Sequence, residues 1–151
     1  MRQPLVIETH SARETEAAGA ALARDLLEKE PDGAVVALSG DLGVGKTAFA
    51  RGAGTVLAPD ACVQSPTYTL VRVYGGPGRQ MIHFDLYRIQ DEDDLLSVGF
   101  YDYLEEGNFL FIEWSERVPQ VLPERFYRVE IERTGEPDGR RIRITGPGEA
   151  L

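Results

Sequence analysis

The residues whose types and spacing bear most directly on chemistry are those at positions 40–47, Gly-Asp-Leu-Gly-Val-Gly-Lys-Thr. They match the phosphate-binding pattern G-x-x-x-x-G-K-[ST], and we refer to them as the P-loop. Glycines let the backbone curl so that consecutive N–H groups face a phosphate. Lys46 can then reach the terminal phosphates, and the Thr47 hydroxyl can ligate Mg²⁺. The pattern predicts that a nucleoside triphosphate binds along the loop and the start of the next helix, at Asp41, Gly43, Val44, Gly45, Lys46, Thr47 and Ala48.

Two carboxylates complete a candidate site for phosphate chemistry. Asp85 follows residues 81–84 and Glu113 follows residues 109–112, and both runs are typical of buried strands. Side chains at such strand ends meet at the carboxyl edge of a sheet, where open α/β folds bind ligands. One carboxylate would hold Mg²⁺ or its waters and the other would orient the attacking water. The residues alone leave that division open. The predicted metal ligands are Thr47, Asp85 and Glu113, and the predicted catalytic residues are Lys46, Asp85 and Glu113.

Three further features lie near these residues in the sequence. His83 precedes Asp85 by two positions and would share its face of a strand, either supporting the site or serving the structure. Trp114, the single tryptophan, directly follows Glu113. Its ring would either lie near bound nucleotide or pack against other side chains of the fold. A polar loop between a helix and a strand is a place for a nucleotide-sensing switch. Its residues are Ser65, Pro66, Thr67 and Tyr68.

The lysines restrict the base that is bound. Guanine-specific GTPases that resemble Ras read the base with N/T-K-x-D, and this chain has two lysines. Lys46 belongs to the P-loop, and Lys29 stands between two glutamates. No D-x-x-G segment follows a strand either. The sequence therefore favours ATP over GTP.

The surrounding segments predict the elements that position these residues. Apolar positions from Ala12 to Leu27 predict an amphipathic helix with Ser11 as its N-cap, and residues 46–57 predict a second helix. Continuous apolar runs at 34–38 and 109–112 predict strands buried on both faces. Residues 5–7 predict an edge strand, and segments 91–97 and 101–106 predict short acidic helices. Hairpins are expected at 69–84 and in the tail from Tyr127 to Ile144. The expected fold is an α/β P-loop NTPase fold, with a mixed sheet that has a parallel centre and antiparallel hairpins.

Composition narrows the class of protein. A chain of 151 residues with 42% hydrophobic residues predicts a single domain over residues 1–151. There is no apolar run of about 20 residues and no signal-like N-terminus, so we expect a protein without a membrane segment. One cysteine and two histidines suit a reducing cytoplasm and form a poor metal-ligand set. A net charge of −9 disfavours an autonomous nucleic-acid binder.

Several segments together resemble the bacterial TsaE (YjeE) family, P-loop ATPases of tRNA threonylcarbamoyladenosine biosynthesis. Thr15 and Gly19 resemble the family's T-x-x-x-G element. The longer segments agree in order and spacing over nearly the whole chain. They are Leu38-Ser39 with the P-loop, Ser65-Pro66-Thr67-Tyr68-Thr69-Leu70-Val71, His83-Phe84-Asp85-Leu86-Tyr87-Arg88 and Ile112-Glu113-Trp114. Two departures are Ser115, where proline is common, and Ala48, where threonine is frequent. Neither removes a proposed chemical group.

The resemblance implies a function and a set of partners. It implies an ATPase that uses ATP and Mg²⁺, is slow alone and depends on its partners, the TsaD and TsaB proteins. Hydrolysis would reset that complex between turnovers, and tRNA would be met only through the complex. By position, Asp85 would serve the metal, Glu113 would support hydrolysis, and residues 65–68 would form the switch-like loop. Thr15 and Trp114 would lie near the nucleotide.

Two other classes share the P-loop. A small-molecule kinase would need an acceptor pocket and a cationic lid, and no Arg-rich insertion is visible in the second half of the chain. A nucleotide-gated binding module needs the same loop as a slow ATPase, so the sequence does not separate these two.

Overall fold

The computed structural model describes residues 4–41, 43–59, 71–74, 81–87, 89–97, 99–105 and 107–147. The strands are β1 (Leu5–Thr9), β2 (Ala34–Ser39), β3 (Val71–Tyr74), β4 (Met81–Asp85), β5 (Phe109–Glu113), β6 (Tyr127–Arg133) and β7 (Arg140–Thr145). The helices are α1 (Ala12–Lys29), α2 (Lys46–Leu57), α3 (Glu92–Ser97) and α4 (Phe100–Glu105), with short 3₁₀ turns at Ser115–Arg117 and Pro119–Val121.

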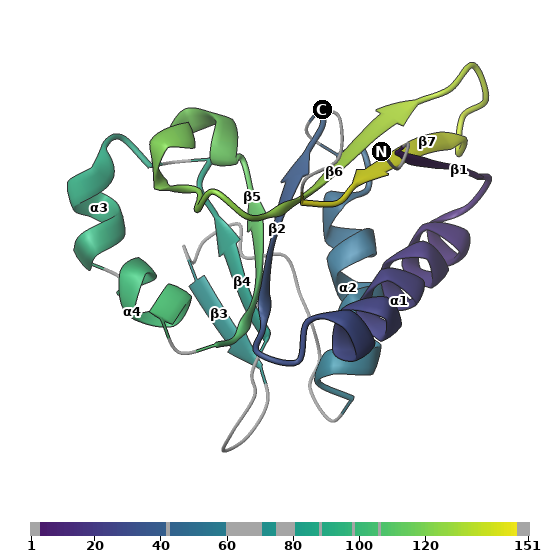
Figure 1. The fold of residues 1–151 in the computed structure, drawn as a ribbon. Helices are drawn as coiled ribbons and strands as arrows, with labels where there is room; N and C mark the ends of the chain where they lie inside the picture. Colours follow the sequence, from purple (N-terminus) through teal and green to yellow (C-terminus); the bar gives the residue numbers. More distant parts are fainter. Residues whose placement is uncertain are drawn as a thin grey trace.

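The described strands form one mixed sheet in the order β1-β7-β6-β2-β5-β4-β3. Strand β2 is parallel to both of its neighbours, β5 and β6, and β4 is parallel to β5. The pairs β3–β4, β6–β7 and β1–β7 are antiparallel. Helices α1 and α2 cover one face, while α3 and α4 lie on the opposite side near β4 (Figure 1). The predicted parallel centre with flanking hairpins is confirmed.

Alternation along the central strands divides the interior into two cores. On β5, Phe109 and Phe111 join the core beneath α1 and α2, whereas Leu110 and Ile112 join the core beneath α3 and α4. Because both faces are covered, every residue of β5 is buried, as the continuous apolar run predicts. The same alternation continues to Glu113. Its position is therefore on the side of the sheet that α2 covers.

Helices α1 and α2 approach each other closely through two glycines. A Cβ added at Gly19 would lie 2.0 Å from the Phe49 carbonyl oxygen, and one added at Gly52 would lie 1.8 Å from the Glu16 carbonyl oxygen. Such distances are far inside van der Waals contact, so only glycine permits this approach. It brings α1 next to the P-loop, which leads into the first turn of α2.

The ends of several elements differ slightly from the predictions. Helix α1 is capped by Ser11, whose hydroxyl accepts from the Glu14 N–H at 3.1 Å, as predicted, but it continues to Lys29 rather than ending at Leu27. Strands β4 and β5 include Asp85 and Glu113 as their last residues, so ladder hydrogen bonds fix both backbones. The predicted turn at residues 75–78 lies outside the described residues. Within the described segments, no helix has the length and apolarity that crossing a membrane requires.

Because the two helices approach so closely, we expect Gly52→Ala to lower the stability of the protein. Alanine in an exposed helix is favoured over glycine by about 1 kcal/mol. Here the added Cβ meets backbone, and overpacking typically costs about 1–3 kcal/mol. We expect the clash to outweigh the helix preference, with a net loss of up to about 2 kcal/mol in the free energy of unfolding, measured by urea denaturation.

The matched control is Gly135→Ala. An added Cβ there meets nothing within 4 Å, so we expect a change within about 0.5 kcal/mol. Equal stability of the two variants would contradict the proposed packing role of Gly52.

Candidate nucleotide-binding site

The P-loop connects the buried strand β2 to α2 through a glycine-rich turn. Gly40, Gly43 and Gly45 have φ angles of 141°, 75° and 122°, which side-chain-bearing residues rarely adopt. At Gly40 an added Cβ would also lie 2.4 Å from the Ile131 carbonyl oxygen. Gly45 caps α2 without a side-chain hydrogen bond. The loop therefore has the open backbone and the helix dipole that bind a phosphate.

Lys46 carries the positive charge of this loop into a largely enclosed position. The residue is 3% exposed. Its Nζ donates to the Gly40 carbonyl oxygen at 2.8 Å and lies 3.6 Å from the centroid of the Trp114 ring. Burial lowers the pKa of Lys46 below its ordinary value, and four nearby carboxylates oppose that shift, with Glu113 first among them. The ammonium group is thus held by one carbonyl group and one aromatic face.

The two predicted carboxylates end adjacent parallel strands. Asp85 and Glu113 are Cα partners in the β4–β5 register. Glu113 is 5% exposed, and its Oε2 lies 2.7 Å from Nε2 of the fully buried His83. Asp85 Oδ1 accepts from the Tyr87 N–H at 2.9 Å. Burial raises the pKa of Asp85, which that hydrogen bond opposes. The strand ends therefore bring the two acids together, close enough to Lys46 for both to raise its pKa.

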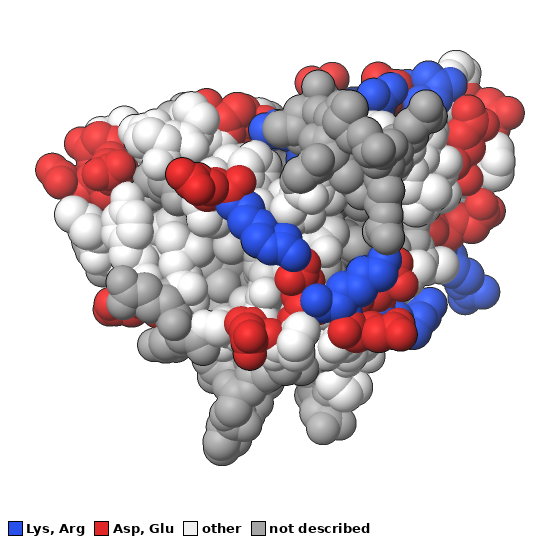
Figure 2. Space-filling view, in the orientation of Figure 1, with Lys and Arg blue, Asp and Glu red and all other residues white. Residues whose placement is uncertain are grey.

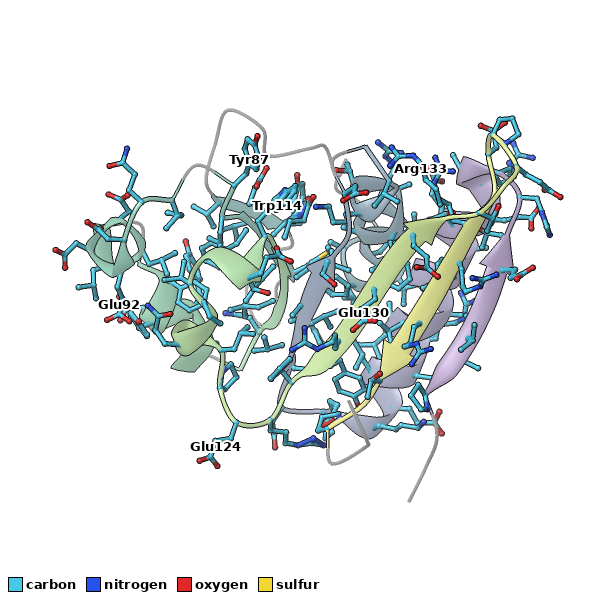
Figure 3. All side chains as sticks on the ribbon, turned by 90° about the horizontal axis from the view of Figure 1, so that it is seen from above. Tyr87, Glu92, Trp114, Glu124, Glu130 and Arg133 are labelled. Atoms are coloured by element: carbon cyan, nitrogen blue, oxygen red, sulfur yellow. The ribbon has the colours of Figure 1, made fainter. Side chains whose placement is uncertain are left out.

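Trp114 follows Glu113 in an uncommon backbone conformation. Its φ of 64° and ψ of 32° make it the one non-glycine residue with positive φ in the described part of the chain. A tryptophan in this region costs roughly 1–2 kcal/mol. Its ring packs against Tyr87 with centroids 5.0 Å apart (Figure 3). The sharp turn after β5 aims the indole at Lys46.

The remaining predicted residues have different surroundings. Thr15 is buried, its hydroxyl shares a hydrogen bond of 2.8 Å with Thr9, and its Cγ2 would lie 3.6 Å from a Cβ at Gly45. Thr15 therefore packs α1 against the loop. Thr47 and Ala48 are half-buried in the first turn of α2. The predicted switch residues 65–68 lie outside the described residues.

Two arginines of the β6–β7 hairpin also reach the P-loop, and the sequence did not indicate them. Arg140 Nε donates to the Val44 carbonyl oxygen at 2.6 Å. Nη2 of Arg133, at the end of β6 (Figure 3), would lie 3.6 Å from a Cβ at Gly43. Both arginines are distant from the P-loop in the sequence, and Arg140 is separated from Val44 by 96 positions. No local pattern could have identified them.

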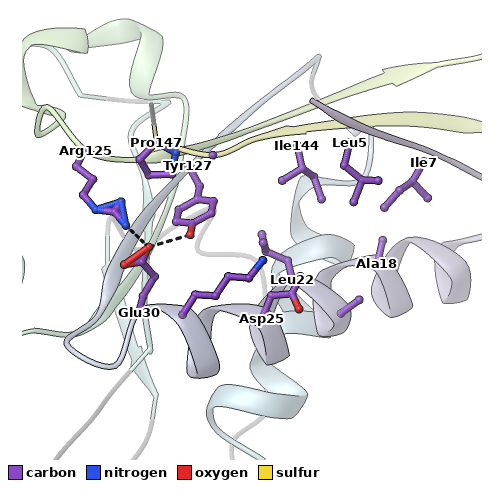
Figure 4. Close-up of a pocket in the computed structure, with 13 residues that line it drawn as sticks. Leu5, Ile7, Ala18, Leu22, Asp25, Glu30, Arg125, Tyr127, Ile144 and Pro147 are labelled. Atoms are coloured by element: carbon purple, nitrogen blue, oxygen red, sulfur yellow. Dashed lines mark hydrogen bonds and ion pairs between the residues drawn. The ribbon is translucent and has the colours of Figure 1, made fainter. Parts of the chain in front are cut away.

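Two cavities are lined by residues other than Lys46. One of about 460 Å³ adjoins Ser39, Gly40 and Asp41 and is otherwise lined mainly by charged side chains of β6 and β7. Another of about 330 Å³ lies between α1 and the β1–β7–β6 end of the sheet (Figure 4). At its polar end Glu30 accepts from Arg125 at 2.5 Å and from Tyr127 at 2.8 Å. These contacts fasten the end of α1 to β6.

The donor set fits a nucleotide that brings its own metal. Among the described residues, no three His, Cys, Asp or Glu side chains group closely enough to hold a metal ion. Mg²⁺ at P-loops takes most of its ligands from phosphates and water and few from protein. The oxygens of Thr47 and Asp85 are ligands of the type that Mg²⁺ prefers. On the face in Figure 2, basic side chains are interspersed with acidic ones and form no continuous basic surface.

Comparisons with known proteins agree with this arrangement. The family model described as "Threonylcarbamoyl adenosine biosynthesis protein TsaE" matches residues 9–142. A Haemophilus influenzae protein named "tRNA threonylcarbamoyladenosine biosynthesis protein TsaE" is 41% identical over 115 residues, which cover 76% of this chain and 73% of that protein. A Treponema pallidum protein of the same name is 37% identical over 133 residues, covering 88% of this chain and 93% of that protein. The crystal structure of Bacillus subtilis YdiB matches 98% of this chain and 88% of its own, with a TM-score of 0.76 and 27% identity.

The half-buried Asp85 carboxyl gives a prediction for stability without nucleotide. Burial raises its folded-state pKa, so its ionised form destabilises the fold once the pH exceeds the ordinary value of 3.8. Asp85→Asn removes that charge and retains an oxygen for the Tyr87 N–H. We expect the variant to be more stable than the native chain at pH 7, with the gain shrinking as the pH approaches 3.8. Urea denaturation across that range measures it.

The exposed Asp138, in the β6–β7 turn, is the control for this substitution. Asp138→Asn should change stability by less than about 0.5 kcal/mol. A loss of stability at pH 7 in Asp85→Asn would contradict the electrostatic account of this carboxyl.

The contact between Lys46 and Trp114 gives a spectroscopic prediction. An ammonium drawn from the indole face toward a phosphate changes the surroundings of the chain's single tryptophan. We therefore expect Mg-ATP to change the emission of Trp114. In Lys46→Met, where no ammonium lies over the ring, the starting emission should already differ from that of the native chain. A flat titration, with binding demonstrated by calorimetry, would refute the link between Lys46 and Trp114.

Proposed function

The chain belongs to the TsaE family, and from this premise we propose that it is an ATP-hydrolysing accessory protein of tRNA threonylcarbamoyladenosine formation. Relatives that match most of the chain carry that biosynthesis in their names. The observation that carries the proposal is the meeting of Lys46 with Asp85 and Glu113 at the carboxyl ends of parallel strands. Phosphate binding alone needs no such pair of acids, whereas hydrolysis of a Mg-nucleotide uses both.

Each proposed role follows from the position of the residue. Lys46 and the loop backbone bind the terminal phosphates, because they supply a positive charge and the N-terminus of α2 there. Thr47 and Asp85 serve Mg²⁺, which when bound neutralises phosphate charge. Glu113 orients the attacking water or accepts its proton. Trp114 covers the bound nucleotide beside Lys46, and Thr15 supports the loop from α1.

The proposed partners are the TsaD and TsaB proteins of the cytoplasm. A net charge of −9 and the interspersed charges of Figure 2 suit a protein that meets tRNA only through such a complex. ATP hydrolysis would then act on the partners between rounds of modification. The loop at residues 65–68 is the proposed nucleotide-sensing segment, and the whole chain of 151 residues is proposed as one domain.

The direct test is ATP turnover by the chain alone and with the TsaB–TsaD pair. We expect slow turnover alone and stimulation by the pair, with ATP preferred to GTP in a competition titration. Phosphorylation of an added small molecule would replace the proposal with a kinase. Tight Mg-ATP binding without turnover under either condition would instead indicate a nucleotide-gated binding module.

Glu113→Gln separates hydrolysis from binding. The substitution retains the shape of the side chain and removes its charge, while Lys46 and the loop remain. General-base assistance contributes about 10²–10⁴-fold to a rate, so kcat should fall by that order with little change in the Kd for Mg-ATP.

Asp85→Asn is the companion variant in that experiment. If Asp85 serves the metal, its substitution should weaken Mg-ATP binding together with turnover. The reverse pattern, with affinity lost in Glu113→Gln and retained in Asp85→Asn, would exchange the two roles. Native turnover in both variants would exclude the pair from hydrolysis.

A further inference from the structure

His83 makes a buried contact with Glu113, the carboxylate that is proposed to orient the attacking water. Its Nε2 lies 2.7 Å from Glu113 Oε2, and the two side chains are 0% and 6% exposed. They come from adjacent parallel strands, β4 and β5. We propose that His83 is a positioning residue that fixes the orientation of the Glu113 carboxylate for ATP hydrolysis. This inference rests on the proposed function.

The hydrogen-bonding capacity of the two side chains determines which is the donor and which is the acceptor. An ionised carboxylate only accepts, so Nε2 of His83 donates to Oε2 of Glu113. The other ring nitrogen, Nδ1, is buried and has no hydrogen-bond partner among the described residues. A proton on Nδ1 would be a buried donor without an acceptor, which proteins avoid. The ring is therefore the Nε2–H tautomer, with its single donor directed at Glu113.

The surroundings favour positioning over simple packing. Met81, two residues earlier on the same face of β4, is fully buried and apolar, so the strand can fill this side with apolar groups. A histidine here instead leaves one ring nitrogen without a partner. The compensating feature is its contact with Glu113. Engaging Oε2 stops rotation of the carboxylate and leaves Oε1 as the oxygen not bound to His83.

This role predicts a change in rate without a matching change in affinity. A displacement of about 1 Å at a catalytic group can cost about 10²-fold in rate. A variant in which Glu113 lacks its hydrogen-bond donor should therefore have a kcat about 10- to 100-fold lower than that of the native chain. The P-loop and Lys46 are unaffected, so the Kd for Mg-ATP should stay within about threefold.

Three variants separate positioning from packing. His83→Leu removes the donor, His83→Gln restores an N–H donor on a side chain of similar reach, and Met81→Leu changes the same face of β4 without changing that donor. We expect kcat to fall in His83→Leu, to recover largely in His83→Gln and to stay native in Met81→Leu. In a Glu113→Gln background, His83→Leu should lower kcat no further. Thermal denaturation identifies any variant that fails to fold. If His83→Leu fails to fold, the kcat of His83→Gln decides between positioning and packing.

The contact itself can be tested without catalysis. The chain has two histidines, so ¹⁵N-histidine labelling of His10→Gln leaves the His83 signal alone. We expect the pattern of a neutral ring protonated at Nε2, shifted by Glu113→Gln. A ring protonated at Nδ1, or a spectrum that Glu113→Gln leaves unchanged, would overturn the contact.

The two proposals fail in different ways. A native chain that hydrolyses no ATP, alone or with TsaB–TsaD, overturns the proposed function, while the ¹⁵N spectrum still reports the contact. Native turnover that His83→Leu leaves within twofold in a folded protein overturns the positioning role alone.

Discussion

The buried ammonium group of Lys46 is the interaction on which the rest of this site depends. A charge on a residue that is 3% exposed is unfavourable unless partners replace water. Without nucleotide those partners are the Gly40 carbonyl oxygen and the Trp114 ring, with Glu113 as the strongest nearby opposite charge. The carbonyl oxygen and the ring carry no full negative charge, which a bound phosphate would bring. The proposed role of the site as an anion-binding site follows from this incomplete set of partners.

Three parts of the fold hold this arrangement in place. Parallel pairing of β4 with β5 sets Asp85 opposite Glu113, so the register of the central strands brings the two acids together. Helix α1 supports the P-loop from one side through the close approach at Gly19 and Gly52. The β6–β7 hairpin supports it from the other side through Arg140. The positive φ of Trp114 and the raised pKa of Asp85 show that this site retains conformations and charges that a stability-optimised protein would lack.

The sequence predicted what local patterns determine. The P-loop, the run from 34 to 38 and the helix from 46 to 57 each carry their signal within a dozen or so residues, and the structure has all three. Strand ends also predicted the meeting of Asp85 and Glu113, because parallel strands share one carboxyl edge. What escaped prediction depends on distant pairing. Nothing near Arg140 indicates that β6 lies beside β2, and only that neighbour brings this arginine to Val44. The sequence also left open whether His83 supports the site or serves the structure, because its partner, Glu113, is 30 residues away.

We propose that the P-loop binds nucleotide phosphate through Lys46. Calorimetric titration of Mg-ATP into the native chain, Lys46→Ala and Lys29→Ala tests it most directly. Lys29, the only other lysine, lines the cavity beneath β1 and serves as the control. We expect binding by the native chain and by Lys29→Ala, and none measurable by Lys46→Ala. Equal Mg-ATP affinity in all three proteins would contradict it.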